Sequence, residues 1–355
     1  MDYIYRFPVV RGVQAKKEYY IAMVPLKMIS KLFPDEEGFI PPEYRAQRRL
    51  NAARVPVISR YILDNKESYV FSALAASIDG EFIFKADQEN HDVGVLEVSM
   101  DATFLINDGQ HRKAAIIDAL NEDPSIGDET ISIVFFEDRG LARSQQIFTD
   151  LNKNAVKTSN SISELYDSRD ELAVLTRQVI SNIEFLNHYT DKEKDILGKY
   201  SSNLFTLNTF YLANKAIVGR HSLTDEVKEF IQVFWQEVTD HMVQWNELQR
   251  KEITKVDLRE NYLSTQGIVI QALGRVGNYF LENSTLNCSD YLGHLQQINW
   301  RRSDPIWKLR AINPRGRIIT NKSAAILIAN VIKTKMGLEL NETEQQQEKN
   351  IQATQ

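Results

Sequence analysis

Apolar and polar residues alternate along residues 3–26, and a period of two residues predicts β-strands. This segment is rich in Tyr, Val and Ile, and Gly12 lies near its middle. We therefore predict two strands with a turn at Gly12. A second turn is predicted at Asp79-Gly80. Similar patterns predict further strands within residues 69–84, 95–100, 102–106 and 130–137.

Apolar spacings of three and four residues predict helices elsewhere in the chain. In the first half, helices are predicted from Leu26, from Pro41-Pro42 through Arg45, from Pro56, from Gln110 and over residues 141–151. Beyond about residue 155 the signals are nearly all helical, and they cover residues 169–185, 205–218, 225–248 and 265–283.

This change of pattern predicts a mixed α+β fold with two domains. An N-terminal α/β domain is expected over residues 1–160, and a predominantly helical domain with a basic C-terminal segment over 161–338. The remaining residues, 339–355, are polar and lack aromatics, so we predict a disordered tail.

Composition narrows the class of protein. The chain has 355 residues, of which 43% are hydrophobic and one is a cysteine, Cys288. A single cysteine excludes a disulfide framework, and its position after a helical segment favours a place in the core. The start lacks the apolar region of a signal peptide, and no apolar run is long enough to span a bilayer. We therefore expect a cytoplasmic protein that does not bind membranes.

The formal net charge of -6 argues against nucleic-acid binding by the whole surface, but the basic residues are concentrated. Residues 45–60 hold five arginines and no acid, and residues 301–322 hold seven basic residues and one acid. Because phosphate binding depends on the local potential, two such segments favour an anionic partner. The predicted DNA-binding residues are Arg45, Arg48, Arg49, Arg54, Arg301, Arg302, Lys308, Arg310, Arg315 and Arg317.

Trp300 and Trp307 alternate with the cations of the second basic segment. Such mixtures suit stacking on bases together with phosphate contacts. The alternative is that the tryptophans belong to the core and the arginines are merely solvated.

A strand, a tight turn and a helix meet at Asp108–Arg112, which reads DGQHR. Backbone N–H groups at the start of a helix favour an anion, and a glycine permits close approach of a ligand. Asp108 is expected to cap the helix, while His111 and Arg112 project towards a phosphate. The predicted phosphate- or nucleotide-binding residues are Asp108, Gly109, Gln110, His111, Arg112 and Asn152. The alternative is a capped turn in which Arg112 pairs with a surface acid.

These residues resemble the signature of the DGQHR-domain proteins, and in particular the DndB family of bacterial DNA phosphorothioation, or DNA sulfur modification, systems. Residues 146–155 are similar to the family's F-x-x-L-N segment, and Arg45–Arg54 to its arginine-rich helix. Trp300–Lys322 is similar to its C-terminal W…P-x-W…G-R-I pattern. The resemblance covers residues 5–335. It implies a DNA-binding regulator or accessory protein of the modification system, with repression of the modification operon as the expected role.

The family is more distantly similar to ParB-type proteins and sulfiredoxins, which implies a ParB/sulfiredoxin-like N-terminal domain that binds nucleotide phosphates. Gln110 occupies the position of the sulfiredoxin cysteine, so sulfiredoxin chemistry is excluded at this turn.

Two other functions stay open. The first is a nucleotide hydrolase or DNA nickase in which Asp108, His111 and Arg112 are catalytic, with a nucleotide and Mg²⁺ as cofactors. The second is a non-catalytic scaffold for the modification enzymes. Double-stranded DNA and other phosphorothioation proteins are the expected partners, and the chain could form a homodimer. The histidines lack zinc-binding spacing, so no metal site is predicted.

Overall fold

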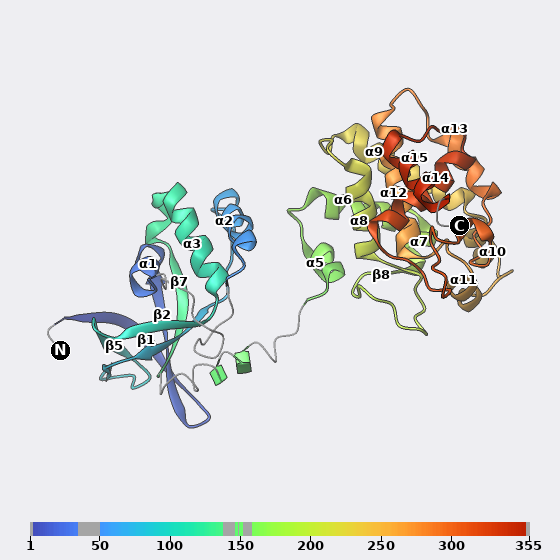
Figure 1. Ribbon diagram of the computed structural model, residues 1–355. Helices are drawn as coiled ribbons and strands as arrows, with labels where there is room; N and C mark the ends of the chain where they lie inside the picture. The colour runs from blue at the N-terminus through green and yellow to red at the C-terminus, as the bar shows by residue number, and fades with distance from the viewer. Residues whose placement is uncertain (1–2, 35–49, 138–145, 148, 152–157, 353–355) are drawn as a thin grey trace. The chain divides into compact units, whose positions relative to one another are not determined.

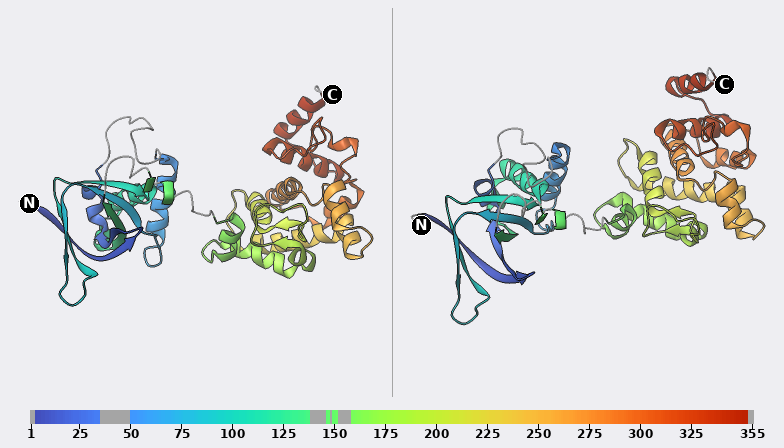
Figure 2. Two further views of the ribbon diagram at one scale, coloured as in Figure 1. Left: turned by 90° about the horizontal axis from the view of Figure 1, so that it is seen from below. Right: turned by 60° about the horizontal axis from the view of Figure 1, so that its bottom comes forward.

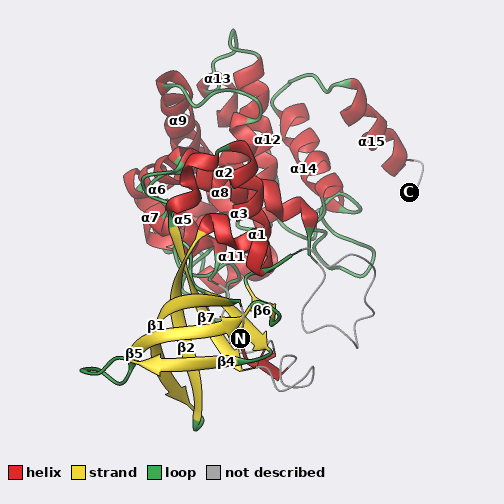
Figure 3. Cartoon of the chain, turned by 90° about the vertical axis from the view of Figure 1, so that its left-hand side faces the viewer, coloured by secondary structure: helices red, strands yellow, loops and turns green. Residues whose placement is uncertain are grey.

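A computed structural model describes residues 3–34, 50–137, 146–147, 149–151 and 158–352. The chain forms two compact units, Met1–Val156 and Lys157–Gln355. We call them the N-terminal unit and the C-terminal unit, and each is described by itself. The predicted mixed α+β fold is confirmed, with strands in the first unit and helices dominating the second (Figure 3).

The N-terminal unit is built on a seven-stranded mixed sheet in the order β4-β5-β1-β2-β7-β3-β6. Adjacent strands are antiparallel except for β3 and β7, which are parallel. The strands are β1 (Ile4–Gln14), β2 (Lys17–Pro25), β3 (Leu74–Asp79), β4 (Phe82–Ala86), β5 (Val93–Ser99), β6 (Thr103–Asp108) and β7 (Thr130–Glu137).

Short helices cover one face of this sheet (Figure 1). Alternate residues such as Val9, Ala22 and Phe135 are buried beneath them, as the two-residue period of a strand requires. The helical segments are η1 (Leu26–Met28), α1 (Ile29–Leu32), η3 (Ala52–Arg54), α2 (Val55–Asp64), α3 (Gln110–Glu122) and η4 (Pro124–Asp128).

The turn predicted at Gly12 is wrong. Gly12 lies within β1 opposite Tyr19, and the chain reverses at Ala15 and Lys16, both of which have positive φ. Glycine and asparagine usually occupy such positions, so Ala-Lys gives no turn signal. A Cβ on Gly12 would lie 2.4 Å from the Tyr19 ring, so a larger residue at this position would require the ring to move.

The turn at Asp79-Gly80 is confirmed, but it joins strands that do not pair with each other. β3 pairs with β6 and β7, whereas β4 pairs with β5. The predicted helix at Pro41-Pro42 through Arg45 and most of the one over 141–151 lie outside the described residues.

The C-terminal unit packs its helices around α8 and α12 (Figure 1). Its four tryptophans, Trp235, Trp245, Trp300 and Trp307, are all fully buried. The helices are α5 (Asn160–Tyr166), α6 (Glu171–Asn182), α7 (Glu184–Tyr189), α8 (Leu207–Val218), α9 (Asp225–His241), α10 (Val243–Gln249), α11 (Lys255–Asn261), α12 (Gly267–Glu282), α13 (Ser289–Leu292), η5 (Gly293–Gln297), η6 (Pro305–Trp307), α14 (Lys322–Lys335) and α15 (Glu342–Gln352). Two short strands, β8 (Thr190–Asp191) and β9 (Phe205–Thr206), pair in parallel.

The prediction of a disordered tail is wrong for residues 342–352, which form α15. Its carboxylates Glu344 and Glu348 pair with Lys333 and Arg310. Because the helix is attached by charge rather than by an apolar face, hydropathy could not predict its docking. No helix among the described residues is long and apolar enough to cross a membrane.

Candidate functional site

The DGQHR turn follows directly from the buried end of β6. Asn107 is fully buried, and its Oδ1 accepts a hydrogen bond of 2.7 Å from the hydroxyl of Ser77 on β3. Gly109 then adopts a φ of 102° and starts α3, as predicted for a glycine at a tight turn. A Cβ at Gly109 would lie 2.4 Å from Cδ2 of Leu74, so both the backbone conformation and the packing require glycine.

Asp108 does not cap α3, contrary to the prediction. No side chain caps this helix among the described residues. Instead Oδ2 of Asp108 accepts a hydrogen bond of 2.6 Å from Nη2 of Arg112, four residues later.

Arg112 is turned towards the residues that come directly before β3. Its Nη1 donates to the carbonyl oxygens of Ser72 and Ala73, each at 2.6 Å, and to the Ser72 hydroxyl at 2.7 Å. The side chain is 18% exposed, whereas that of Asp108 is 42% exposed. The guanidinium therefore links the start of α3 to the chain before β3. The sequence allowed a pairing of Arg112 with an acid, but it did not indicate the contacts with Ser72 and Ala73.

His111 joins this turn to the arginine-rich segment. Its Nε2 accepts a hydrogen bond of 3.1 Å from the backbone N–H of Asn51, just before η3. Burial, together with the nearby charge of Arg54, lowers the pKa of His111 below its usual 6.5. The ring is therefore neutral at pH 7 and carries its proton on Nδ1, which suits a hydrogen-bond acceptor better than a phosphate-binding cation.

Gln110 is the first residue of α3, directly beside these groups. Asn152, the last residue predicted for this site, lies outside the described residues, as do Arg45, Arg48 and Arg49. Arg54 is described and exposed at the end of η3.

The tryptophans of the second basic segment belong to the core. Trp300 and Trp307 stack on each other at 5.2 Å between ring centroids, with 15° between their planes. Both are buried, so they cannot stack on nucleic-acid bases, and the alternative of core tryptophans is confirmed.

Two of the predicted DNA-binding arginines are engaged inside the C-terminal unit. Arg302 donates to the carbonyl oxygens of Tyr262 and Arg259, and burial lowers its pKa. Arg310 pairs with Glu348, at 2.5 Å from Nη2 to Oε2. In this structure both guanidinium groups therefore make contacts inside the C-terminal unit, and DNA binding by these two residues stays a prediction.

The other four cations, Arg301, Lys308, Arg315 and Arg317, are exposed. None of them has an ion-pair partner among the described residues, although Arg301 lies 4.8 Å from the ring centroid of Tyr262. Arg315 and Arg317 occupy a turn organised by Asn313, whose Oδ1 accepts hydrogen bonds of 2.9 Å from both of their backbone N–H groups. Gly316 has a φ of 75°, so the turn needs a glycine between the two arginines.

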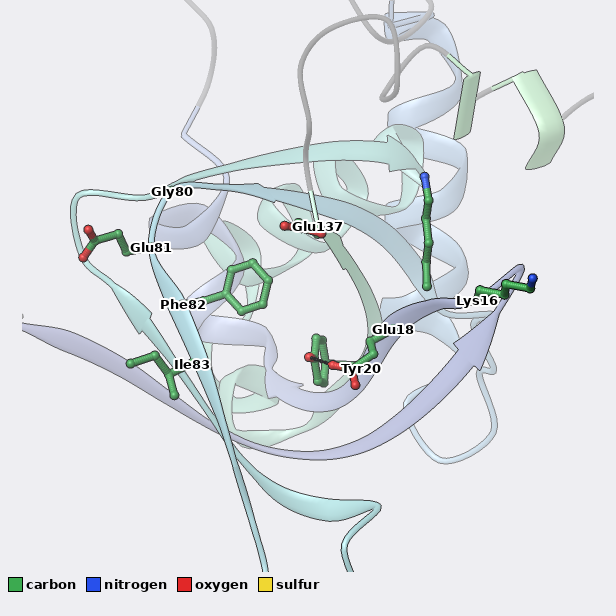
Figure 4. A pocket seen from close by; sticks show the side chains of 9 residues that line it. Lys16, Glu18, Tyr20, Gly80, Glu81, Phe82, Ile83 and Glu137 are labelled. Carbon is green, nitrogen blue, oxygen red and sulfur yellow. Dashed lines mark hydrogen bonds between the residues drawn. The ribbon is translucent and has the colours of Figure 1, made fainter.

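A pocket that the sequence did not reveal lies on the N-terminal unit. Its volume is about 650 Å³, and it is formed by the starts of β2 and β4 and the end of β7 (Figure 4). The Tyr20 hydroxyl donates to Glu18 at 2.6 Å, and the Tyr20 and Phe82 rings meet edge to face. The lining residues are Lys16, Lys17, Glu18, Tyr20, Gly80, Glu81, Phe82, Ile83 and Glu137. Three carboxylates against two lysines make this pocket unsuitable for a phosphate.

Cys288 is buried, as predicted, and burial raises the pKa of its thiol. Within the part of the chain that the structure describes, no three His, Cys, Asp or Glu side chains are grouped so that they could hold a metal ion.

Comparison with protein families decides which system the chain belongs to. The model of the DndB family, described as DNA-sulfur modification-associated, matches residues 7–339.

The chain belongs to the DndB family. No curated protein and no solved structure matches it. Membership of the family places the chain in DNA sulfur modification systems. The match spans both units, so it includes the DGQHR turn and the basic segment with its exposed arginines. The ParB/sulfiredoxin-like character predicted for the N-terminal unit stays a prediction.

Proposed function

We propose that this DndB-family chain is a DNA-binding regulator of DNA sulfur modification that contacts duplex DNA through its exposed C-terminal cations. We call Arg301, Lys308, Arg315 and Arg317 the basic surface. The observation that carries the proposal is the Asn313–Arg317 turn, whose backbone is held by Asn313 and which exposes two arginines that have no ion-pair partner among the described residues.

Electrostatics supports this role even though the chain is acidic overall. Cations with no acidic partner are available to neutralise phosphates, and each phosphate contact releases counterions. A turn whose backbone is already ordered loses less conformational entropy on binding than a flexible arm. Regulation of the modification genes then requires that the protein prefers its promoter to other sequences.

A phosphate- or nucleotide-binding role of the DGQHR turn stays a prediction. The geometry supports it less than the sequence did, because the Arg112 guanidinium already contacts four oxygen atoms. Among the residues that the structure describes, no contact favours hydrolysis by Asp108, His111 and Arg112 over a structural role. Other sulfur-modification proteins, or a second copy of the chain, are further predicted partners.

The test is the affinity for a duplex containing the modification promoter. At constant low salt, Arg315→Gln/Arg317→Gln should weaken binding about tenfold or more, because two phosphate contacts are lost. Lys215→Gln/Arg220→Gln is the matched control, since it also removes two exposed positive charges, at α8 and just beyond it. Equal affinities for the two variants would refute the proposed surface, and equal affinity for promoter and scrambled duplexes would refute sequence-specific repression.

A further inference from the structure

The C-terminal helix α15 is attached to the C-terminal unit mainly through charge. Nζ of Lys333 lies 2.6 Å from Oε2 of Glu344, and these side chains are only 3% and 9% exposed. Oε2 of Glu348 accepts from both Nε and Nη2 of Arg310. The amide of Asn330 donates to the Glu344 carbonyl oxygen and to Oε1 of Glu348. The carboxylates of α15 thus fill a site that is formed by the cations of Arg310 and Lys333 and the amide of Asn330. Figure 2 shows α14 and α15 at the C-terminal end of the chain.

Apolar burial contributes little to this attachment. Ile351 and Glu344 are the two buried residues of α15 among those described. Burial of one isoleucine stabilises far less than the ordering of an 11-residue helix costs in backbone entropy. The ion pairs must therefore provide most of the docking free energy.

The polar contacts of α15 are also incomplete. Oδ1 of Asn330 and Oε1 of Gln347 are buried without a hydrogen-bond partner among the described residues. Unsatisfied buried polar atoms weaken an interface. Segments with few buried apolar contacts are the ones that open locally before the rest of a fold, and α15 has few such contacts.

Opening of α15 would leave strong anion-binding groups without a counter-charge. Lys333 is buried and also lies 4.2 Å from the Tyr279 ring centroid, so it cannot simply turn into solvent. Arg310 belongs to the same short segment as Lys308 and the Asn313–Arg317 turn. A buried cation that loses its partner favours any anion that replaces it.

We propose that Arg310, Lys333 and Asn330 form a phosphate-binding site for the DNA backbone, and that Glu344 and Glu348 of α15 occupy this site in place of phosphate. The inference rests on the proposed function, because the ligand is the duplex that binds the basic surface. DNA and α15 compete for the same cations, so the helix lowers DNA affinity and is displaced when DNA binds. DNA must therefore displace α15 before it can bind Arg310, Lys333 and Asn330.

The test compares duplex affinity and hydrogen exchange in the full-length protein. Glu344→Gln/Glu348→Gln removes both competing carboxylates. Glu339→Gln/Glu342→Gln is the matched control, because it removes two exposed acids next to and within the same helix. The first variant should bind DNA at least about fivefold more tightly than the control. The slope of its log K against log salt should also be larger in magnitude, by about one to two, than the slope of the control. Adding Arg310→Gln to the first variant should reverse the gain.

Exchange in the wild-type protein supplies a readout that needs no variant. Binding of DNA should accelerate amide exchange in Glu342–Gln352 while slowing it in the Asn313–Arg317 turn. The inference is overturned if wild-type protein binds DNA but exchange in α15 is unchanged or slowed, or if the two double variants bind equally. Absence of DNA binding in every variant would instead overturn the proposed function itself, and the inference with it.

Discussion

Replacement of Arg112 by methionine should destabilise the N-terminal unit by about 2–4 kcal/mol. Methionine keeps an unbranched apolar side chain but lacks the guanidinium that contacts Asp108, Ser72 and Ala73. A hydrogen bond to a charged group contributes about 1.5–3 kcal/mol, and a buried acceptor left unsatisfied costs about 1–3 kcal/mol. Asp108 is 42% exposed and Ser72 is exposed, so water can rehydrate their oxygen atoms, which keeps the expected loss below the sum of these values.

Hydrogen exchange measures this destabilisation of the N-terminal unit within the full-length protein. A loss of 2–4 kcal/mol should accelerate exchange of the most protected amides in Leu74–Asp79 about 30- to 1000-fold. Tryptophan fluorescence gives an internal control, since all four tryptophans lie in the C-terminal unit and their denaturation midpoint should not change. Arg60→Met is the matched variant, because Arg60 pairs with Glu122 at 3.1 Å on the surface, where such a pair contributes only about 0–1 kcal/mol.

Unchanged exchange in β3 would refute the structural role assigned to Arg112. If the same variant also lost DNA or phosphate binding, the guanidinium would be a ligand-binding group, as the sequence pattern predicts.

Three further predictions concern other single groups. Gly109→Ala should destabilise the N-terminal unit by about 2–3 kcal/mol, because its φ is positive and the new Cβ meets Leu74; equal exchange rates in β3 of variant and wild type would contradict this. Burial, helped by Asp195 and Asp170, raises the pKa of Glu164 from 4.5 to about 7, so the stability of the C-terminal unit falls as pH rises from 4.5 through 7. Glu164→Gln should therefore raise the free energy of unfolding by about 1–3 kcal/mol at pH 8 and much less at pH 5, as followed by tryptophan fluorescence; the same gain at both pH values would exclude titration of Glu164 as the cause. The lowered pKa of His111 implies that its contribution to the stability of the N-terminal unit is present above pH 6.5 and lost as pH falls through the folded-state pKa. Arg54→Gln should raise the pKa of His111. An NMR titration that gives a pKa of 6.5 or higher for His111 in the wild-type protein would contradict this assignment.

Hydrophobic periodicity and turn residues correctly predicted those strands and helix starts that short sequence segments determine. The apolar run at Thr130–Glu137 is strand β7, and α3 begins at Gln110, where the glycine turn predicted it. The first hairpin was misplaced because Ala15 and Lys16 adopt a conformation that their side chains do not favour.

The candidate site was predictable in position but not in its contacts. Apart from Asp108, which lies four residues away, the acceptors of Arg112 lie 39 and 40 residues before it in sequence, so no local pattern could show these contacts. Likewise, the pairing of Arg310 with Glu348 spans 38 residues and separates this arginine from its exposed neighbours. Exposure of Arg315 and Arg317 follows from their turn, whose Asn-Pro-Arg-Gly-Arg sequence does indicate it.

Salt dependence of duplex binding tests the central claim most directly. Log K for the wild-type protein should fall linearly with log salt, and Arg315→Gln/Arg317→Gln should reduce the magnitude of that slope by about two, since each phosphate contact contributes about 0.9. A slope that is the same in wild type and variant, or the absence of measurable binding by the wild-type protein at low salt, would contradict the account.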